Sequence, residues 1–341
     1  MSESATLPRR GRLKRADCAG PGIKRVRRGR GFSFSDCDGT SIEDEETLER
    51  IRQLAIPPAW KEVWICPDPF GHIQATGYDE AGRKQYLYHK RWQQRQAERK
   101  FELVREFALK LPKLRRAVTA DLRRTGMPRE RALACAVRLL DLGFFRVGSE
   151  VYAEENESFG LATVRREHVT IGKSEVVFDF PAKSGQRRIQ SIRDAAARRA
   201  LDAMYRRRSG PDDLLAYCEG REWRDVRSEE INEYIHEKIG DDFTAKNFRT
   251  WHGTVLAAVE LAGEEPPRSQ AAAKRTIKRA VDQVSEALGN TPAVCRASYI
   301  DPRVIDRYRD GVTIKPPTSS NGRLTTKQRH QIEKEVINLT A

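Results

Sequence analysis

Long apolar runs are missing from this sequence. No stretch of its 341 residues approaches the roughly 18 consecutive apolar residues that a membrane-spanning helix requires. The first residues, Met1–Pro8, also lack the apolar segment of a secretory signal peptide. These absences argue against a membrane-spanning or secreted protein and predict a cytoplasmic one.

Cysteine and aromatic residues are scarce. The six cysteines stand apart, with no Cys-x-x-Cys pair and no histidine at zinc-ligand spacing. The sequence therefore predicts free thiols and excludes a zinc ribbon or a disulfide framework. Aromatic residues make up 8% of the chain and hydrophobic residues 38%. That content suffices for a globular core, and a chain of this length prefers about two domains.

Positive charge is what the sequence has in excess. It holds 63 Lys and Arg residues against 49 Asp and Glu, a formal net charge of +14. Such charge attracts a long polyanion such as a nucleic acid, and this attraction does not depend on the nucleotide sequence. Ten of the cations lie between Arg9 and Arg30, where no apolar period is visible, and this segment is predicted to be a flexible basic arm. The same composition fits two alternatives equally well: an arm that contacts DNA, or a solvated tail that does not bind nucleic acid.

Residues 32–88 have the pattern of a small β-rich domain. Short runs of β-branched and aromatic residues, at 63–65, 72–76 and 85–88, are separated by proline and glycine. The last run lies in Gly82–Trp92, where cations and aromatic rings alternate. This arrangement offers phosphate contacts together with flat ring surfaces. An amphipathic edge strand with polar flanks fits the same pattern.

The apolar period changes from strand to helix near residue 95. Apolar residues recur at helical spacing before Pro112 and again before Gly143. A β interval at 168–192 interrupts the helices, and helical segments then resume.

Two of these later helices have predicted N-caps, Ser228 and Thr244. The sequence therefore predicts an α+β protein. A basic arm and a β-rich domain are expected at 1–95. A mainly α-helical domain with a small antiparallel sheet and a C-terminal tail is expected at 96–341.

One tyrosine stands where a nucleophile is useful. Tyr299 follows the polar turn Gly289–Pro292 and precedes a helix start at Asp301-Pro302. A tyrosine beside a helix N-terminus in so basic a chain suggests covalent attack on a phosphodiester. Most tyrosines instead pack in a core or at an interface, and that alternative applies here too.

Breaking a phosphodiester also requires fixed positive charge around the phosphoryl oxygens and an acid for the leaving alkoxide. Arginine suits the first task because its guanidinium stays charged and offers a planar fork to two oxygens. Arg146 follows the predicted helix end at Gly143. Arg249 lies about one turn inside the helix that begins at Thr244. Their positions alone do not distinguish them from surface arginines.

Five ordered elements resemble those of type IB DNA topoisomerases, specifically the small poxvirus-like enzymes and their bacterial branch. They are Phe145-Arg146-Val147-Gly148, Lys183 in a predicted hairpin, Lys246-x-x-Arg249, Gly289-Asn290-Thr291-Pro292, and Tyr299 nine residues after Asn290. The resemblance covers most of the chain and implies the catalytic fold shared with tyrosine recombinases.

The resemblance also implies a reaction. Tyr299 would attack the scissile phosphate to give a 3′-phosphotyrosyl link, and the free 5′-hydroxyl strand would rotate before religation. Arg146 and Arg249 would hold the nonbridging oxygens, and Lys183 would protonate the leaving 5′ oxygen. Supercoiled duplex DNA would be relaxed without metal, ATP or other cofactor. A solvated turn lysine remains the alternative for Lys183.

Further DNA contacts follow from the same resemblance. It assigns them to Gln85, Tyr86, Tyr88, Tyr152 and Lys246. The implied partner is duplex DNA, clamped by a monomer, and the implied setting is the bacterial nucleoid.

Asn290 departs from the best-known relatives, since poxviral and nuclear enzymes carry histidine at this place. Asparagine can donate a hydrogen bond to a phosphoryl oxygen, but it cannot shuttle a proton near neutral pH. Asn290 is therefore predicted to act as a donor, with a turn residue after Gly289 as the alternative. His252, three residues past Arg249, is predicted to serve packing or phosphate positioning and to take no part in the chemistry.

Two other functions fit parts of the pattern. A tyrosine site-specific recombinase would share the fold and the tyrosyl chemistry, but it normally carries histidine where Lys246 stands. An architectural DNA-binding protein would explain the charge, the arm and the aromatic strand without catalysis. It would leave the ordered elements around Tyr299 unexplained.

Overall fold

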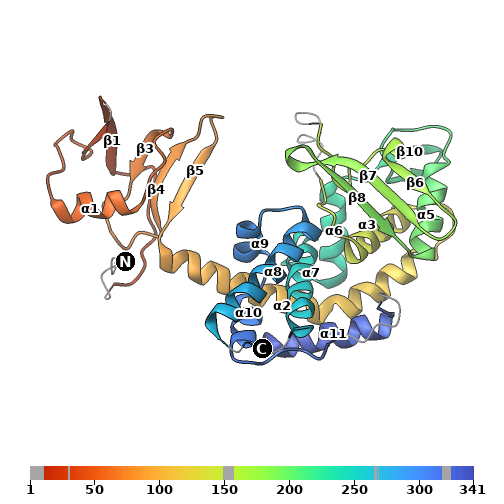
Figure 1. Ribbon diagram of the computed structural model, residues 1–341. Helices are drawn as coiled ribbons and strands as arrows, with labels where there is room; N and C mark the ends of the chain where they lie inside the picture. Colours follow the sequence, from red (N-terminus) through yellow and green to blue (C-terminus); the bar gives the residue numbers. More distant parts are fainter. Residues whose placement is uncertain (1–10, 30, 149–156, 265–266, 268, 317–323) are drawn as a thin grey trace. The chain divides into compact units, whose positions relative to one another are not determined.

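The computed structural model describes residues 11–29, 31–148, 157–264, 267, 269–316 and 324–341. The chain divides into two compact units, Met1–Lys100 and Phe101–Ala341 (Figure 1). None of the helices within the described ranges is long and apolar enough to cross a membrane.

The first unit is built on a five-stranded antiparallel sheet with strand order β2-β1-β3-β4-β5. Its strands are β1 (Ile23–Arg28), β2 (Gly31–Ser35), β3 (Lys61–Ile65), β4 (Ile73–Tyr78) and β5 (Lys84–Tyr88). Helix α1 (Glu45–Gln53) is capped by Asp44 and contributes Ile51 to the core. The small core that results is the β-rich domain expected from the sequence.

The basic arm was predicted wrongly for much of its length. Its second half, Ile23–Arg28, is strand β1, which pairs with both β2 and β3. Further upstream, the backbone of Lys14 exchanges hydrogen bonds with Phe70 and His72. The apolar period was invisible because only Ile23 of this strand is buried, while cations occupy most of its other positions. Helix α1 was also missed in a segment that was expected to hold only strands.

The second unit is mainly helical. Helix α2 (Lys90–Asp121) begins in the first unit and continues into the second. The other helices are α3 (Arg129–Leu142), α5 (Ala195–Tyr205), α6 (Ser228–Ile239), α7 (Ala245–Ala262), α8 (Gln270–Leu288), α9 (Pro292–Ser298), α10 (Pro302–Arg309) and α11 (Thr326–Leu339). The short 3-10 helices are η1 (Arg166–His168) and η2 (Lys183–Gly185).

Two small sheets complete the second unit. One is the three-stranded antiparallel sheet of β6 (Val169–Ile171), β7 (Val176–Ala182) and β8 (Gln186–Ile192), and the other is the hairpin of β9 (Ala216–Glu219) and β10 (Glu222–Asp225). In β7 the buried rings of Phe178 and Phe180 contact Phe145. The fold class predicted from the sequence is therefore confirmed.

Helix α7 lies at the centre of this unit. It contacts α3, α6, α8, α10 and α11, and Phe248 and Trp251 on it are fully buried. Phe248 meets Phe107 of α2 edge to face, with ring centroids 4.9 Å apart. Because α7 carries Arg249 between these two anchors, the packing of the core fixes the path of that arginine.

Several local predictions can be compared with the elements. Thr244 caps α7, as predicted, and α8 ends at Gly289 in the left-handed region with φ of 59°. The N-cap of α6 is Arg227 instead of Ser228, which is the first helical residue. Helix α2 continues through Pro112 to Asp121, because buried Leu111 and Leu114 hold it to the core on both sides of the proline.

Candidate active site

The segment that carries Arg146 is anchored on both sides. Phe145 is buried against β7, and the carbonyls of Arg146 and Val147 accept hydrogen bonds from the backbone of Leu161 and Ala162 at 2.8 and 2.7 Å. The half-buried Arg146 side chain donates from Nη2 to the Gly289 carbonyl and to Asn290 Oδ1, both at 2.7 Å. Arg146 therefore spans from the end of α3 to the end of α8.

Arg249 is buried and, like Arg146, links the segment after α3 to the end of α8. Its Nη1 donates to the Phe144 carbonyl at 2.5 Å and its Nη2 to the Leu288 carbonyl at 2.8 Å. Burial, followed by the charge of Arg146, lowers the pKa of Arg249 to about 10, although interactions with Tyr299 oppose this shift. The guanidinium still carries its proton at neutral pH. Two mutually repelling cations held together favour the binding of an anion between them.

Tyr299 is the C-cap of helix α9, and α10 begins three residues later at Pro302, so the tyrosine lies at a junction between two short helices. Its ring is half-buried beneath Arg249, whose guanidinium carbon is 5.4 Å from the ring centroid. Its backbone is fixed by hydrogen bonds from its N–H to Cys295 and from Thr254 Oγ1 to its carbonyl. Arg146, Arg249, Asn290 and Tyr299 are thus brought together.

Asn290 is half-buried, and its carbonyl oxygen is occupied by Arg146. Its amide nitrogen is shielded from solvent and has no hydrogen-bond partner among the described residues. A buried donor without a partner is costly unless a ligand satisfies it. The amide is therefore available to donate to a bound oxygen.

The two lysines of the predicted site lie outside this buried group. Lys183 is exposed on η2, at the tip of the β7–β8 hairpin (Figure 1). Lys246 is exposed in the first turn of α7.

Strand β5 presents the aromatic residues expected at a DNA-facing surface. Tyr86 and Tyr88 are exposed on one face and stack with ring centroids 6.1 Å apart. The Lys84 ammonium lies 5.9 Å from the centroid of the Tyr86 ring. Gln85 alternates to the other face and donates to Asp79 at 2.9 Å. Tyr152 lies outside the described residues.

Arg188 is a site residue that the sequence reasoning missed. It lies on β8, and its two terminal nitrogens donate to the carbonyls of Glu286 and Ala287 in the last turn of α8. Burial and the charge of Arg146 lower the pKa of Arg188. No motif marked it, because its role depends on a strand and a helix end that are 98 residues apart.

His252 is buried beside the site, as part of the packing. Its ring meets Phe144 edge to face, with centroids 5.7 Å apart, and neither ring nitrogen has a hydrogen-bond partner among the described residues. Burial, with the charge of Arg329, lowers the pKa of His252 to about 4. It is therefore neutral at pH 7.

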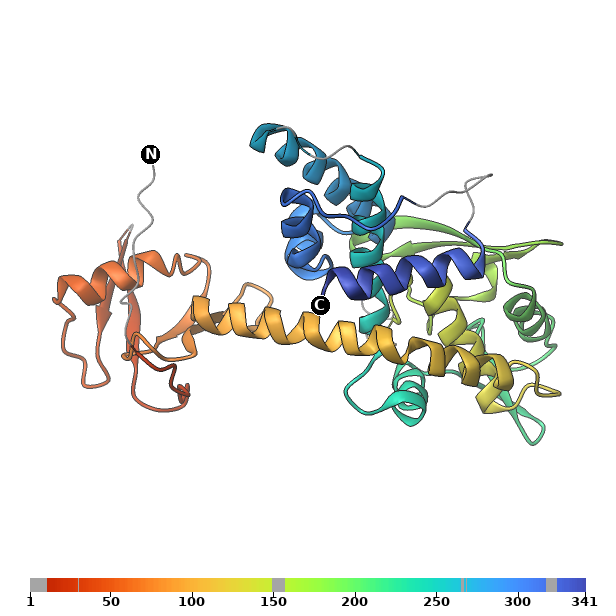
Figure 2. The ribbon, with the colours of Figure 1, turned by 90° about the horizontal axis from the view of Figure 1, so that it is seen from below.

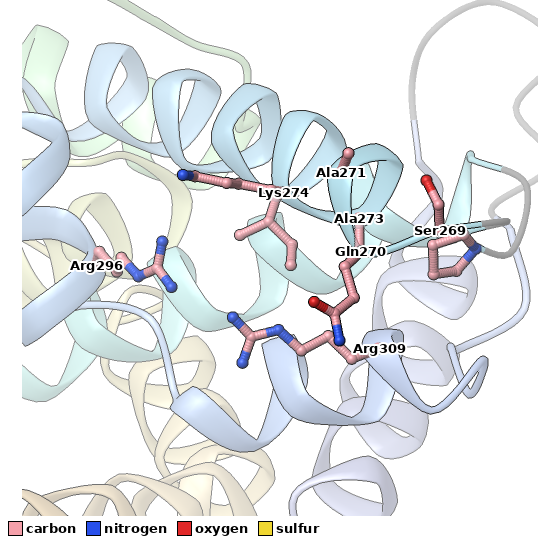
Figure 3. A pocket seen from close by; sticks show the side chains of 9 residues that line it. Ser269, Gln270, Ala271, Ala273, Lys274, Arg296 and Arg309 are labelled. Carbon is pink, nitrogen blue, oxygen red and sulfur yellow. The ribbon is translucent and has the colours of Figure 1, made fainter. Parts of the chain in front are cut away.

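A cavity of about 970 Å³ lies beside α9. Figure 3 shows Lys274 of α8, Arg296 of α9 and Arg309 of α10 around it. Arg296 comes three residues before Tyr299, so this cavity adds positive charge next to the helix that leads to the tyrosine. Within the described part of the chain, no group of three or more His, Cys, Asp or Glu residues could hold a metal ion.

Comparison with known proteins identifies the family of this chain. Residues 89–317 match the family described as eukaryotic DNA topoisomerase I, catalytic core. Residues 31–79 match the N-terminal domain of bacterial DNA topoisomerase IB. The chain therefore belongs to the type IB DNA topoisomerases, and it is an enzyme that acts on DNA. Its first unit is of the bacterial kind.

Two viral relatives cover most of the chain, and a yeast relative covers about half of it. DNA topoisomerase 1B of Acanthamoeba polyphaga mimivirus is 31% identical over 297 residues, which span 85% of this chain and 88% of the relative. DNA topoisomerase 1B of vaccinia virus strain Copenhagen is 21% identical over 282 residues, 79% of this chain and 84% of the relative. DNA topoisomerase 1 of Schizosaccharomyces pombe is 27% identical over 165 residues, 48% of this chain and 19% of the relative.

Proposed function

We propose that the enzyme relaxes supercoiled duplex DNA by transient cleavage of one strand, with Tyr299 as the nucleophile. The observation that carries this proposal is the position of the Arg249 guanidinium, 5.4 Å from the Tyr299 ring centroid, in electrostatic contact with Arg146. A nucleophile and two cations that converge on one point are what phosphoryl transfer to a side chain requires.

The proposed step exchanges one phosphodiester for another. The Tyr299 oxygen attacks the scissile phosphorus as its proton leaves to solvent, and the bond from phosphorus to the 5′ oxygen breaks. Lys183 donates the proton that converts the leaving oxygen into a 5′-hydroxyl. In religation Lys183 takes back the proton of that hydroxyl as it attacks the phosphotyrosine. The bond from phosphorus to the Tyr299 oxygen then breaks, and the tyrosine oxygen regains a proton from solvent.

Arg146 and Arg249 stabilise the charge that grows on the nonbridging oxygens, and the Asn290 amide adds a neutral donor. Each donor of this kind is worth about 10² to 10³ in rate. The arginines act from fixed positions, since each is tied to backbone carbonyls. Lys246 contributes a further phosphate contact from the exposed first turn of α7.

No energy source is needed for this exchange. The bond that forms and the bond that breaks are both phosphate esters, so cleavage and religation are close to balanced, and supercoil relaxation itself is downhill. The arginines supply the charge stabilisation that a metal ion supplies in other phosphoryl-transfer enzymes. We propose that neither ATP nor a metal ion takes part.

We also propose how the two parts of the chain divide the work. Residues 1–95 bind DNA, with the stacked Tyr86 and Tyr88 and the neighbouring Lys84 on the contact surface, and Gln85 as a further contact from the same strand. Residues 96–341 carry the chemistry, with Tyr152 as a further contact. A single monomer clamps the duplex through both parts, and the working location is the nucleoid.

Relaxation of plasmids that lack repeat sites tests the proposal. Positively and negatively supercoiled plasmids should both be relaxed in EDTA without nucleotide. Tyr299→Phe should abolish relaxation and covalent attachment to a DNA 3′ end while it leaves noncovalent binding nearly intact, because it removes one hydroxyl and no charge at neutral pH. Covalent complex formation by this variant would refute the assignment of the nucleophile.

A further inference from the structure

A buried cluster of charged side chains lies next to the site. Arg115 of α2 is at its centre and donates to both carboxylate oxygens of Asp141 on α3, at 2.8 and 2.9 Å. It also donates to both carboxylate oxygens of Glu333 on α11, at 2.6 and 2.7 Å. The two acidic side chains are only 5% and 7% exposed. Paired bidentate bonds of this kind fix direction as well as distance.

Arg329, also on α11, closes the cluster. It donates to Asp141 Oδ1 at 2.9 Å and to Glu333 at 3.2 Å. It also donates to the backbone carbonyl of Asp141 at 2.5 Å. Asp141 lies in the last turn of α3, where carbonyls have no partner within the helix. The side chain of Arg329 therefore holds the end of α3 through its backbone.

The cluster leads directly to the catalytic groups. Three residues after Asp141, the Phe144 carbonyl accepts the Nη1 hydrogen bond of Arg249. The Phe144 ring contacts His252, which lies one turn after Arg249 on α7. His252 in turn interacts electrostatically with Arg329. The charged side chains of α11 are thus linked to the segment before Arg146 and to the helix that carries Arg249.

Helix α11 is firmly attached to this part of the unit. Ile332 and Val336 are buried, and the helix packs against α7 and α10 (Figure 2). Its Ile337 carbonyl accepts a hydrogen bond from Arg105 of α2 at 3.2 Å. The match to the topoisomerase catalytic core ends at residue 317, so α11 lies beyond it.

We infer that α11 is a positioning element of the active site: Arg329 and Glu333 hold the end of α3, and through Phe144 and His252 they keep Arg249 and Arg146 in the geometry that cleavage requires. This inference rests on the proposed roles of these two arginines. It makes a C-terminal helix outside the matched core necessary for the rate of the reaction.

Arg329→Gln tests the inference in the full-length enzyme. Single-turnover cleavage is measured on a suicide substrate at saturating DNA, and the rate constant and the final fraction of covalent complex are read separately. We expect a rate at least about tenfold lower, since small misplacements of catalytic groups are costly. The final fraction and the Kd for noncovalent DNA should be nearly unchanged. A variant that merely folds poorly would instead lose final fraction and keep its rate.

Three further variants sharpen the result. Arg329→Lys, which keeps the charge but loses the fork, should fall between Arg329→Gln and wild type. Lys334→Gln removes a cation from the exposed face of the same helix and should cleave like wild type. Glu333→Gln keeps the shape of its side chain, and if Arg329→Gln does not fold, it is measured in the same way.

An unchanged rate constant in the folded Arg329 and Glu333 variants would overturn the inference. It would leave the proposed function intact as long as the wild-type enzyme still forms the covalent complex through Tyr299. Loss of covalent chemistry at Tyr299 in the wild-type enzyme would instead remove the proposed function itself.

Discussion

The backbone of Gly253 faces that of Tyr299 so closely that a Cβ atom on Gly253 would lie 2.6 Å from the Tyr299 carbonyl oxygen. That distance is shorter than real Cβ contacts, so any other residue must push the tyrosine backbone or helix α7 aside. The glycine thus allows the nucleophile to lie against the helix that carries Arg249. This close approach leads to the first prediction.

Gly253→Ala should slow cleavage strongly, by about 10² if the Tyr299 oxygen moves by about 1 Å. Alanine is the better helix former by about 1 kcal/mol, so helix propensity predicts the opposite, a more stable α7. Gly263→Ala is the matched control, because a Cβ there would meet only carbonyls of its own helix end at 3.7 Å or more. Single-turnover rates for both variants decide the matter, and equal rates would show that the tyrosine tolerates the displacement.

Asn290 should act through its unpaired amide. Asn290→Ala should lose about 10² or more in cleavage rate, whereas Asn290→His should retain substantial activity, because it keeps a donor. Asn290→Asp should be worse than alanine, since a carboxylate would face the charge of the phosphate. Cleavage and religation are measured on one suicide substrate. If alanine cleaves as fast as asparagine, the residue serves only the turn after α8.

Lys183→Ala should slow cleavage of an ordinary 5′-oxygen substrate, because the leaving alkoxide then lacks its acid. A substrate with a 5′-thio leaving group, which departs without protonation, should restore the rate. Lys173→Ala, an exposed lysine in the turn before β7, serves as the control and should behave like wild type on both substrates. Without rescue by the thio substrate, another residue must be the acid.

His252 should make the fold sensitive to acid. Its pKa is lowered from 6.5 to about 4, so between these values the unfolded chain binds a proton that the folded protein does not. Stability is therefore complete above pH 6.5 and falls as the pH drops toward 4, by about 3 kcal/mol. The lowered pKa of Asp141, about 2, acts at still lower pH. Burial alone would raise the pKa of Asp141, but the charges of Arg329 and Arg115 outweigh the effect of burial.

Urea unfolding at a series of pH values measures this effect. His252→Gln should flatten the loss of stability between pH 6.5 and 4. His330→Gln, which changes an exposed histidine on α11, should leave the pH profile as in wild type. An unchanged profile for His252→Gln would mean that other groups cause the acid sensitivity.

The sequence by itself determined the class of the molecule and predicted the residues of its chemistry. The motifs around Arg146, Arg249, Asn290 and Tyr299 are short and local. Their residue types and spacing can therefore be recognised without a structure. The same holds for Gly289 and Thr244, which end and begin helices through local backbone geometry. Strand Ile23–Arg28 was hidden because cations masked its apolar period, and the short strands β9 and β10 were also missed.

Only the tertiary structure decided how these residues are held. Arg188 donates hydrogen bonds to the end of α8 from a distant strand. Arg329 donates to Asp141, although the two residues are 188 positions apart in the sequence. Such pairings depend on which helix and strand ends meet in the core, and no local pattern records them. The reason is physical: a buried charge must find its partners wherever the packed chain brings them, and packing is a property of the whole fold.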